Sequence, residues 1–296
     1  LSEAGVTTAI RYGHTADGTP VQLAILNNGQ IEVHILSYAA AIQKLFVPDS
    51  KGRKVDVVLG FDDVAGYEAN GGSLGSVVGR FANRIAGAHF YLNAEEYTVT
   101  ANDNGNCLHS GLHGFDRTVF EMEQAPDVED GVLLRAVSPD GQDGFPGTVT
   151  LEVLYSLVGS GLMIQYTATT DAPTVINITN HSYFNLNGHN AGSVLGHRLA
   201  MDANAYLETD AQLIPTGQII PVAGTPMDFT EEKTIGRDIG ADYPALHLGG
   251  GYDHCFTVPD AGLRHFAWLP VGARTICVQG IGLVGKVLDV LPASRG

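Results

Sequence analysis

The chain has 296 residues, with 16 Lys and Arg against 32 Asp and Glu, and its formal net charge is −16. This charge argues against nucleic acid and anionic membrane surfaces as partners, because both are polyanions. Hydrophobic residues make up 44% of the chain and charged residues 16%, a composition that excludes global disorder.

Short runs rich in Val, Ile, Leu and Thr, separated by turn residues, predict β-strands early in the chain. These runs cover residues 21–25, 31–36, 42–47 and 55–59. The clearest pair follows at residues 148–158 and 162–170. In the first of these two runs, apolar residues from Val149 to Leu157 alternate with other residues, so one set is predicted to be buried. Gly159-Ser160-Gly161 between the runs predicts a hairpin turn.

The sequence lacks long helical periodicity and also lacks a regular alternation of strands and helices. Both absences argue against doubly wound and βα-barrel folds. Many short strands with Gly-rich turns instead predict an all-β fold, a large antiparallel β-sandwich with few short helices. No repeat or linker-like composition divides the chain, so residues 1–296 are predicted to form a single domain.

The three cysteines, Cys107, Cys255 and Cys277, are widely spaced and include no CxxC pair. They predict neither a disulfide framework nor a structural zinc site, but buried free thiols in a reducing compartment. No apolar run reaches the roughly 18 residues that cross a bilayer. The first residues lack the basic and apolar blocks of a signal peptide. A cytoplasmic location is therefore predicted.

Most of the 11 histidines sit in polar or Gly-rich surroundings and are predicted to be surface or turn residues; these include His14, His89, His189, His197 and His247. The segment from Cys107 to Phe120 differs, because it crowds His109 and His113 among glycines. Taken alone, it indicates a tight glycine-supported turn with locally hydrogen-bonded histidines. A metal site is the weaker alternative, since no adjacent carboxylate completes a ligand set.

A second unusual segment lies between residues 176 and 187, where four asparagines surround His181, Ser182 and Tyr183. Asn is poor in strand interiors. So many hydrogen-bond donors and acceptors suit a polyhydroxylated ligand, whose hydroxyls need partners. An Asn-rich turn is the structural alternative, and the segment favours a binding site over it.

Several motifs occur in a fixed order along the chain. They are Gly79-Arg-Phe-Ala-Asn-Arg-Ile85, Leu108-His-Ser-Gly111, Gly114-Phe-Asp-Arg117, Ser138-Pro-Asp-Gly141 with Gly144-Phe-Pro-Gly147, Thr179-Asn-His-Ser-Tyr-Phe-Asn185, Leu213-Ile-Pro-Thr-Gly217 and Gly251-Tyr-Asp-His254. In this order they resemble the aldose 1-epimerase (galactose mutarotase) family, over residues 10–268.

The resemblance implies a mutarotase-like β-sandwich with a sugar groove on a concave sheet face. It also implies interconversion of the α and β anomers of free aldohexoses such as galactose and glucose, without a metal or an organic cofactor. By the same resemblance, His181 is the general acid that protonates the ring oxygen. The residues implied to contact sugar hydroxyls are Asn83, Arg84, His109, Ser182, Tyr183 and Asp253.

The end of the chain departs from the family pattern. The family's general base is a Glu near the C-terminus, whereas here no Glu follows Glu232 and the only acid after residue 268 is Asp289. Residues 261–296 also hold four basic residues against that single acid, unlike the acidic body. Residues 268–296 are therefore predicted to be an atypical or replaced end, by divergence, splicing or sequence error. No general base is found.

Two alternatives to a mutarotase follow from the sequence. Without its base, the chain would be a non-catalytic sugar-binding protein on the same fold. An enzyme acting on hexose 6-phosphates would need a basic phosphate site, for which Arg80 and Arg117 are the candidates, although Lys and Arg are scarce. The sequence determines neither the exact sugar preference nor the oligomeric state.

Overall fold

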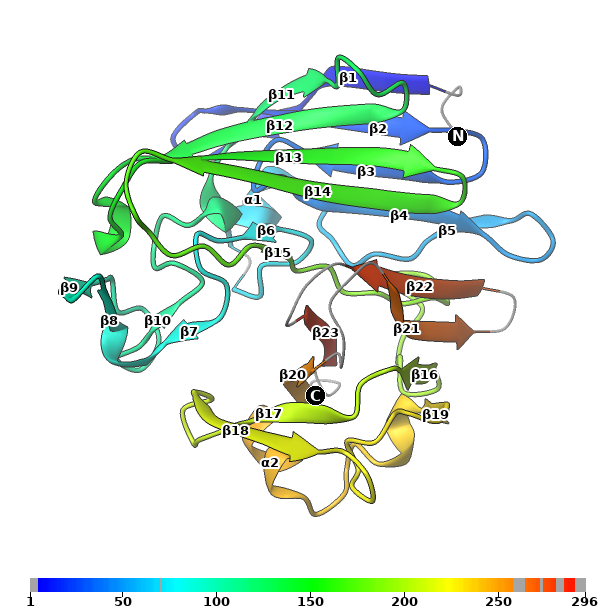
Figure 1. Ribbon diagram of the computed structural model, residues 1–296. Helices are drawn as coiled ribbons and strands as arrows, with labels where there is room; N and C mark the ends of the chain where they lie inside the picture. The colour runs from blue at the N-terminus through cyan, green and yellow to red at the C-terminus, as the bar shows by residue number, and fades with distance from the viewer. Residues whose placement is uncertain (1–4, 70, 258–263, 272–273, 281–284, 291–296) are drawn as a thin grey trace. The chain divides into compact units, whose positions relative to one another are not determined.

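The computed structural model describes residues 5–69, 71–257, 264–271, 274–280 and 285–290, and strands dominate it (Figure 1). Two short α-helices occur among these residues, α1 (Val64–Glu68) and α2 (Pro244–Gly249). The prediction of an all-β fold with few short helices is confirmed. The chain divides into two compact units, Leu1–Phe184 and Asn185–Gly296. That the whole chain behaves as a single domain stays a prediction.

The first unit begins with an antiparallel sheet of five strands that follow one another in chain order. They are β1 (Gly5–His14), β2 (Pro20–Asn27), β3 (Glu32–Leu36), β4 (Ile42–Pro48) and β5 (Lys54–Asp56). The first three predicted strands are confirmed within one or two residues as β2, β3 and β4.

The fourth predicted strand is shorter than residues 55–59. The Asp56 carboxylate accepts hydrogen bonds from the amides of Leu45 and Val58, which ends the pairing with β4. Beyond this point the chain turns toward the segment that holds the predicted sugar site. Val58 bridges to Phe184, and the Leu59 amide donates to the Tyr183 carbonyl over 2.9 Å.

The second sheet of this unit is antiparallel as well, in the order β11-β12-β13-β14. Its strands are β11 (Glu121–Gln124), β12 (Gly131–Ser138), β13 (Val149–Val158) and β14 (Gly161–Thr170). The predicted hairpin is confirmed, with Val158 paired to Gly161 across a two-residue turn in which Gly159 has a φ of 58°. The predicted alternation is also present, because every second residue from Val149 to Leu157 is buried.

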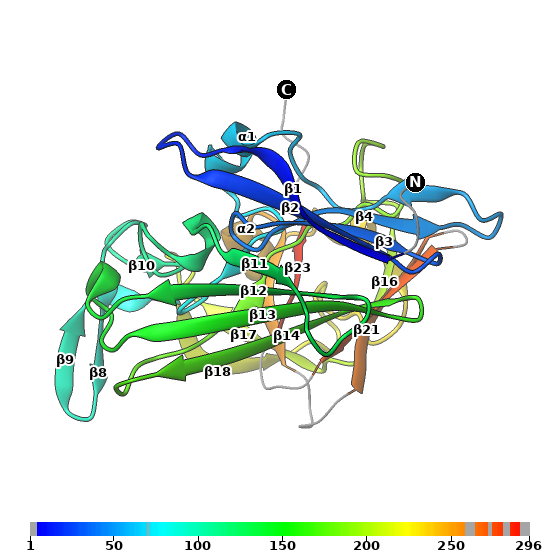
Figure 2. The same ribbon diagram turned by 90° about the horizontal axis from the view of Figure 1, so that it is seen from above.

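The two sheets form layers that face each other, as Figure 2 shows with β1–β4 above β11–β14. Tyr155 spans the layers, since its hydroxyl donates to the Ala40 carbonyl over 2.7 Å. Burial of the ring raises the pKa of this phenol well above its usual value. The Tyr155 hydroxyl is therefore a polar group inside the sandwich core that has its hydrogen-bond partner.

Short antiparallel strand pairs extend from this sandwich and carry the loops of the predicted site. β6 (Val77–Val78) pairs with β15 (Thr179–Asn180), and β7 (Arg84–Ile85) pairs with β10 (Cys107–Leu108). β8 (His89–Leu92) and β9 (Glu95–Thr98) form a separate hairpin.

The second unit contains two antiparallel sheets, in the orders β19-β16-β21-β22 and β18-β17-β20-β23. The strands are β16 (Arg198–Met201), β17 (Ala205–Thr209), β18 (Pro215–Pro221), β19 (Lys233–Thr234), β20 (Tyr252–Thr257), β21 (Arg264–Val271), β22 (Arg274–Gly280) and β23 (Gly285–Val290). Phe229 packs edge-to-face on Tyr252 and Phe256 in its core. The predicted atypical end, residues 268–296, falls partly outside the described residues; its described parts add strands to both sheets.

His197 corrects one sequence prediction, because it is buried and is no surface residue. Its Nε2 accepts a hydrogen bond from the Leu186 amide over 2.9 Å, and burial lowers the pKa of the imidazole. Cys107 is buried and unbonded to another cysteine, as predicted, whereas Cys255 is only partly buried. The side chain of Cys277 lies outside the described residues. No helix among the described residues is long and apolar enough to cross a membrane.

Candidate active site

His181 lies just after β15 and is held by its own backbone. Its amide donates to the Ser76 carbonyl over 2.8 Å, and its carbonyl accepts from the Gly75 amide over 3.0 Å. Gly75 has a φ of 73°, and a Cβ there would lie 2.4 Å from the Ile42 carbonyl oxygen. Only glycine fits this position. The backbone on both sides therefore fixes the place of the imidazole, which is 8% exposed.

Two further predicted site residues surround the His181 ring. The ring of His109 meets it edge-to-face, with centroids 5.4 Å apart and planes at 79°. The Tyr183 ring lies 5.2 Å away on a tilted plane. Residues far apart in sequence are thus brought together around one imidazole, as expected from the motifs.

Ser182 follows His181, and its side chain differs from most buried hydroxyls. Its amide donates to the Asn180 side-chain oxygen over 3.1 Å. Its Oγ is buried and has no hydrogen-bond partner in the part of the chain that the structure describes. Buried polar atoms in native proteins normally have partners, so this unsatisfied hydroxyl is an exception.

The loop that carries His109 is conformationally unusual. Three consecutive residues, His109, Ser110 and Gly111, have positive φ values of 53°, 71° and 89°. Left-handed conformations of non-glycine residues cost free energy and cluster at functional sites. The Ser110 hydroxyl accepts from the Phe81 amide over 2.7 Å, and Asn83, with a φ of 71°, adjoins the same loop. The surrounding contacts therefore impose this shape.

Asn83 and His109 exchange two hydrogen bonds. The Asn83 amide donates to Nδ1 of His109 over 2.9 Å, and the His109 amide donates to the Asn83 carbonyl over 3.1 Å. The Asn83 side-chain oxygen accepts from the Arg84 amide over 2.9 Å. Three predicted site residues are thereby held together by hydrogen bonds that their backbone amides donate.

Arg84 lies on β7, and its guanidinium is held by a carboxylate. Its Nε donates to Asp103 Oδ2 over 2.7 Å, with the two side chains only 17% and 23% exposed. A partly buried charge-assisted bond of this kind orients the guanidinium plane. Asp103 was not predicted from the sequence, because nothing in its surroundings distinguishes it from other loop acids.

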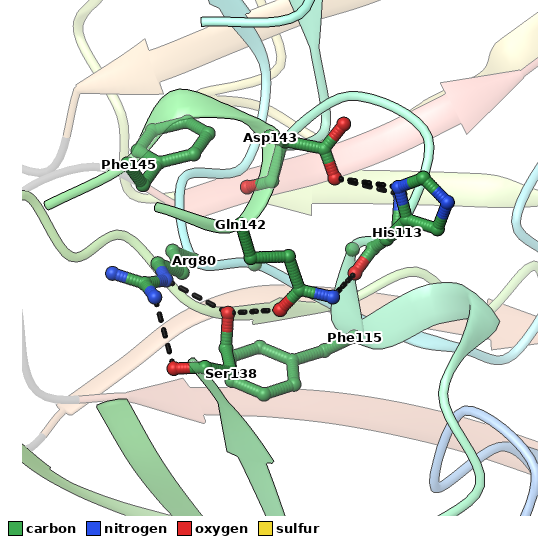
Figure 3. A pocket seen from close by; sticks show the side chains of 10 residues that line it. Arg80, His113, Phe115, Ser138, Gln142, Asp143 and Phe145 are labelled. Carbon is green, nitrogen blue, oxygen red and sulfur yellow. Dashed lines mark hydrogen bonds and ion pairs between the residues drawn. The ribbon is translucent and has the colours of Figure 1, made fainter. Parts of the chain in front are cut away.

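Asp143 anchors the far end of the His109 loop and was also missed. Its carboxylate accepts from the amides of Leu112 and His113 over 3.0 and 2.9 Å, and from Nδ1 of His113 over 3.2 Å (Figure 3). Burial raises the pKa of the Asp143 carboxyl, but hydrogen bonds from Leu112, Thr100 and His113 outweigh it and hold the pKa below its usual value.

Asp116 supports the other side of the site. Its Oδ2 accepts from the Ser73 hydroxyl over 3.0 Å, and burial raises the pKa of this carboxyl. Ser73 begins the short loop whose residues Gly75 and Ser76 hold the backbone of His181. A buried carboxyl thus ties down the loop beneath the candidate acid.

Arg80 lines a cavity of about 10 Å³, which is room for one water molecule and not for a sugar (Figure 3). Its Nε donates to the Ser138 hydroxyl, and its terminal nitrogens donate to the carbonyls of Ser138, Pro139 and Pro146 over 2.8–2.9 Å. Burial lowers the pKa of this guanidinium. Protein oxygens occupy the donors of this guanidinium. Arg80 therefore does not form the phosphate site that an enzyme acting on hexose 6-phosphates would need.

Comparison with known proteins gives the family. Residues 22–280 match the model of the family described as aldose 1-epimerase. The galactose mutarotase of Bos taurus is 39% identical over 271 residues, 92% of this chain and 74% of that protein. The aldose 1-epimerase of Escherichia coli is 35% identical over 248 residues, 83% of this chain and 70% of that protein.

A solved structure agrees. The galactose 1-epimerase of Lactobacillus acidophilus superposes with a TM-score of 0.80 at 28% identity, covering 91% of this chain and 78% of that one. The chain belongs to the aldose 1-epimerase family. It is therefore an isomerase with a mutarotase function, and the resemblance found in the sequence is confirmed.

Within this aldose 1-epimerase, the first unit brings Asn83, Arg84, His109, Ser182 and Tyr183 into one connected region with His181. Asp253 belongs to β20 of the second unit, in register with Asp289 on β23. Its place in the same site stays a prediction. Among the described residues, no three His, Cys, Asp or Glu side chains gather into a possible metal site.

Proposed function

We propose that the chain interconverts the α and β anomers of free aldohexoses, galactose and glucose among them, with His181 as the general acid. The observation that carries this proposal is the fixed His181 imidazole, held through the backbone and flanked by the rings of His109 and Tyr183. An imidazole is the side chain best suited to exchange a proton near neutral pH.

The reaction opens and recloses a hemiacetal. A base takes the proton of the anomeric hydroxyl, the bond between C1 and the ring oxygen breaks, and His181 gives a proton to that oxygen. The C1–C2 bond of the open sugar then turns, and the same proton transfers run in reverse as the ring closes on the other face. The base is not assigned to a residue.

The remaining residues bind and orient the sugar. The Asp103-bound guanidinium of Arg84 and the buried Ser182 hydroxyl offer hydrogen bonds to sugar hydroxyls, with Asn83, His109, Tyr183 and Asp253 as further contacts. A neutral sugar suits this set better than a hexose phosphate, because the buried Arg80 is occupied by protein oxygens. No organic cofactor or metal takes part in the proposal.

Replacement of His181 by Ala tests the proposal. Polarimetry of freshly dissolved α-galactose should show mutarotation slowed by about 10²–10⁴-fold, the usual contribution of a positioned acid. His89→Ala is the matched control, because His89 is exposed and its contacts are local, with the Gly87 carbonyl and the Tyr91 ring. An unchanged rate in the His181 variant would falsify the acid assignment.

The second candidate is a sugar-binding protein without catalysis, because none of the described residues is assigned as the base. Titration with galactose, followed by anomer-exchange NMR of the same sample, separates the two functions. Binding together with accelerated exchange supports the mutarotase. Binding without accelerated exchange supports the sugar-binding protein and contradicts the catalytic proposal.

We further propose a cytosolic location. Burial raises the pKa of the Cys107 thiol to about 11, which keeps it protonated and inert. Asn180-His-Ser forms a glycosylation sequon, but the Asn180 side chain donates to the Gly75 carbonyl within the site. A glycan there would break this contact. Fractionation of cells that express the tagged protein checks the location.

A further inference from the structure

The contact between Asn83 and His109 identifies which ring nitrogen of His109 carries the proton. A backbone N–H can only donate, and the Asn83 amide points at Nδ1 of His109 over 2.9 Å. Nδ1 must therefore present its lone pair. In the neutral ring the proton then sits on Nε2.

The backbone around the ring is held in place as well. The His109 amide returns a hydrogen bond to the Asn83 carbonyl, and β7 pairs with β10 directly beside the two residues. Both residues also hold positive φ values that the surrounding contacts impose. An imidazolium at His109 would set a second N–H against the Asn83 amide, so protonation would cost this hydrogen bond.

We infer that His109 is held as the neutral imidazole with its proton on Nε2, and that it serves the bound sugar as a hydrogen-bond donor and not as a proton source. The second half of this inference rests on the proposed function. The titratable groups nearby include His181, whose ring lies edge-to-face at 5.4 Å, and the Arg84–Asp103 ion pair beside Asn83. His109 therefore keeps its Nε2 proton and donates a hydrogen bond, whereas His181 exchanges a proton with the sugar.

Long-range ¹H–¹⁵N correlation NMR of the ¹⁵N-histidine-labelled full chain at neutral pH tests the tautomer without any sugar. The signals that disappear in His109→Gln assign the His109 ring. We expect the cross-peak pattern of the Nε2–H tautomer. His197 is the internal control, because the Leu186 amide donates to its Nε2 and predicts the opposite, Nδ1–H tautomer. An Nδ1–H or an imidazolium pattern at His109 overturns the inference.

Two substitutions at the same position test the donor role. Gln places an amide N–H near the position of Nε2, whereas Asn reaches only to the level of Nδ1, where its oxygen accepts from the Asn83 amide. Asn also tolerates the φ of 53° at this position. We expect kcat/KM for galactose to fall about 10-fold further in His109→Asn than in His109→Gln, the value of one hydrogen bond.

Equal losses of about 10²–10⁴-fold in both variants, typical of a removed acid, would overturn the donor role. Far-UV circular dichroism and the melting temperature of each variant establish that the fold is retained. A failed His181→Ala test would contradict the proposed function and leave the NMR result on His109 unaffected. The two failures are thus distinguishable.

Discussion

Two polar regions of the first unit, the Arg80 pocket and the His181 cluster, are both largely buried and have opposite characters. Around Arg80, five protein oxygens accept from one guanidinium. The network continues through Ser138 and Gln142 to the backbone of His113 (Figure 3). Around His181, the loops hold left-handed non-glycine residues, and the Ser182 hydroxyl is buried without a partner among the described residues.

The difference distinguishes polar groups that stabilise the fold from polar groups that bind a ligand. A buried polar group whose hydrogen bonds all end on the same protein adds rigidity and leaves nothing for a ligand. A strained backbone with an unsatisfied hydroxyl is retained where a ligand completes the set. Substitutions in the Arg80 pocket should therefore change stability before activity, and substitutions in the His181 cluster should do the reverse.

Arg80→Met gives the largest expected effect on stability. It removes the donors for three carbonyls and two hydroxyls at buried or partly buried positions, and uncompensated buried acceptors cost about 1–3 kcal/mol each. Urea denaturation should show the free energy of unfolding reduced by roughly 3 kcal/mol or more. The kcat of the protein that remains folded should change less than 3-fold, because Arg80 contacts no predicted sugar residue.

The control for this substitution is Arg135→Met. Arg135 is 46% exposed and pairs with Glu152 on the surface of the sheet. Exposed pairs contribute about 0–1 kcal/mol. If Arg80→Met unfolded no more easily than this control, or lost activity while keeping its stability, the contrast between the two regions would be wrong.

Asp143→Asn gives a smaller, pH-dependent effect and tests the anchor of the His109 loop. The carboxylate oxygens accept from two amides and from His113, and an Asn side chain can match only one of these oxygens. The free energy of unfolding should fall by about 1–2 kcal/mol at pH 7. Because the loop also carries His109, the KM for galactose should rise.

The sign of the pH dependence follows from the lowered pKa of Asp143. A carboxyl with a lower pKa in the folded state stabilises the protein above its unfolded pKa, which is about 4. This contribution is lost as the pH falls through the folded pKa. The stability difference between the wild-type chain and Asp143→Asn should therefore be full at pH 7 and shrink below about pH 4.

Predictions from the sequence were confirmed where the pattern of neighbouring residues determines the local structure. Alternation along residues 148–158 predicted the buried face of β13, and Gly159 marked the turn. The ordered motifs located His181, His109 and Asn83 in one region, because each motif carries its own local geometry. Two tight loops, one with Gly75 and one with Gly111, then bring these motifs together.

Prediction failed where the position of a residue depends on a contact with a residue farther along the sequence. His197 is flanked by Gly196 and Arg198, which suggested a surface position, yet the amide of Leu186 needs its ring as an acceptor. Asp103 and Asp143 looked like ordinary loop acids until their partners, 19 and about 30 residues away, were in place. Arg80 was a candidate phosphate ligand because its sequence motif shows the charge but not the carbonyls that surround it.

A pair of serines gives the smallest and most direct test, since each region contains one. The Ser138 hydroxyl accepts from Arg80 and donates to Gln142, so Ser138→Ala should cost about 1–2 kcal/mol of stability. The buried Ser182 Oγ has no partner among the described residues, so Ser182→Ala should leave the melting temperature unchanged or slightly higher. Losing a hydrogen bond to the sugar should instead raise the KM for galactose by about 10-fold, with little change in kcat.

Calorimetry and polarimetry on the two variants, made in parallel, should thus give opposite results. If Ser182→Ala were instead the less stable variant and its KM for galactose stayed constant, the Ser182 hydroxyl would stabilise the fold and would not bind the sugar. The contrast between the Arg80 pocket and the His181 cluster would then be wrong.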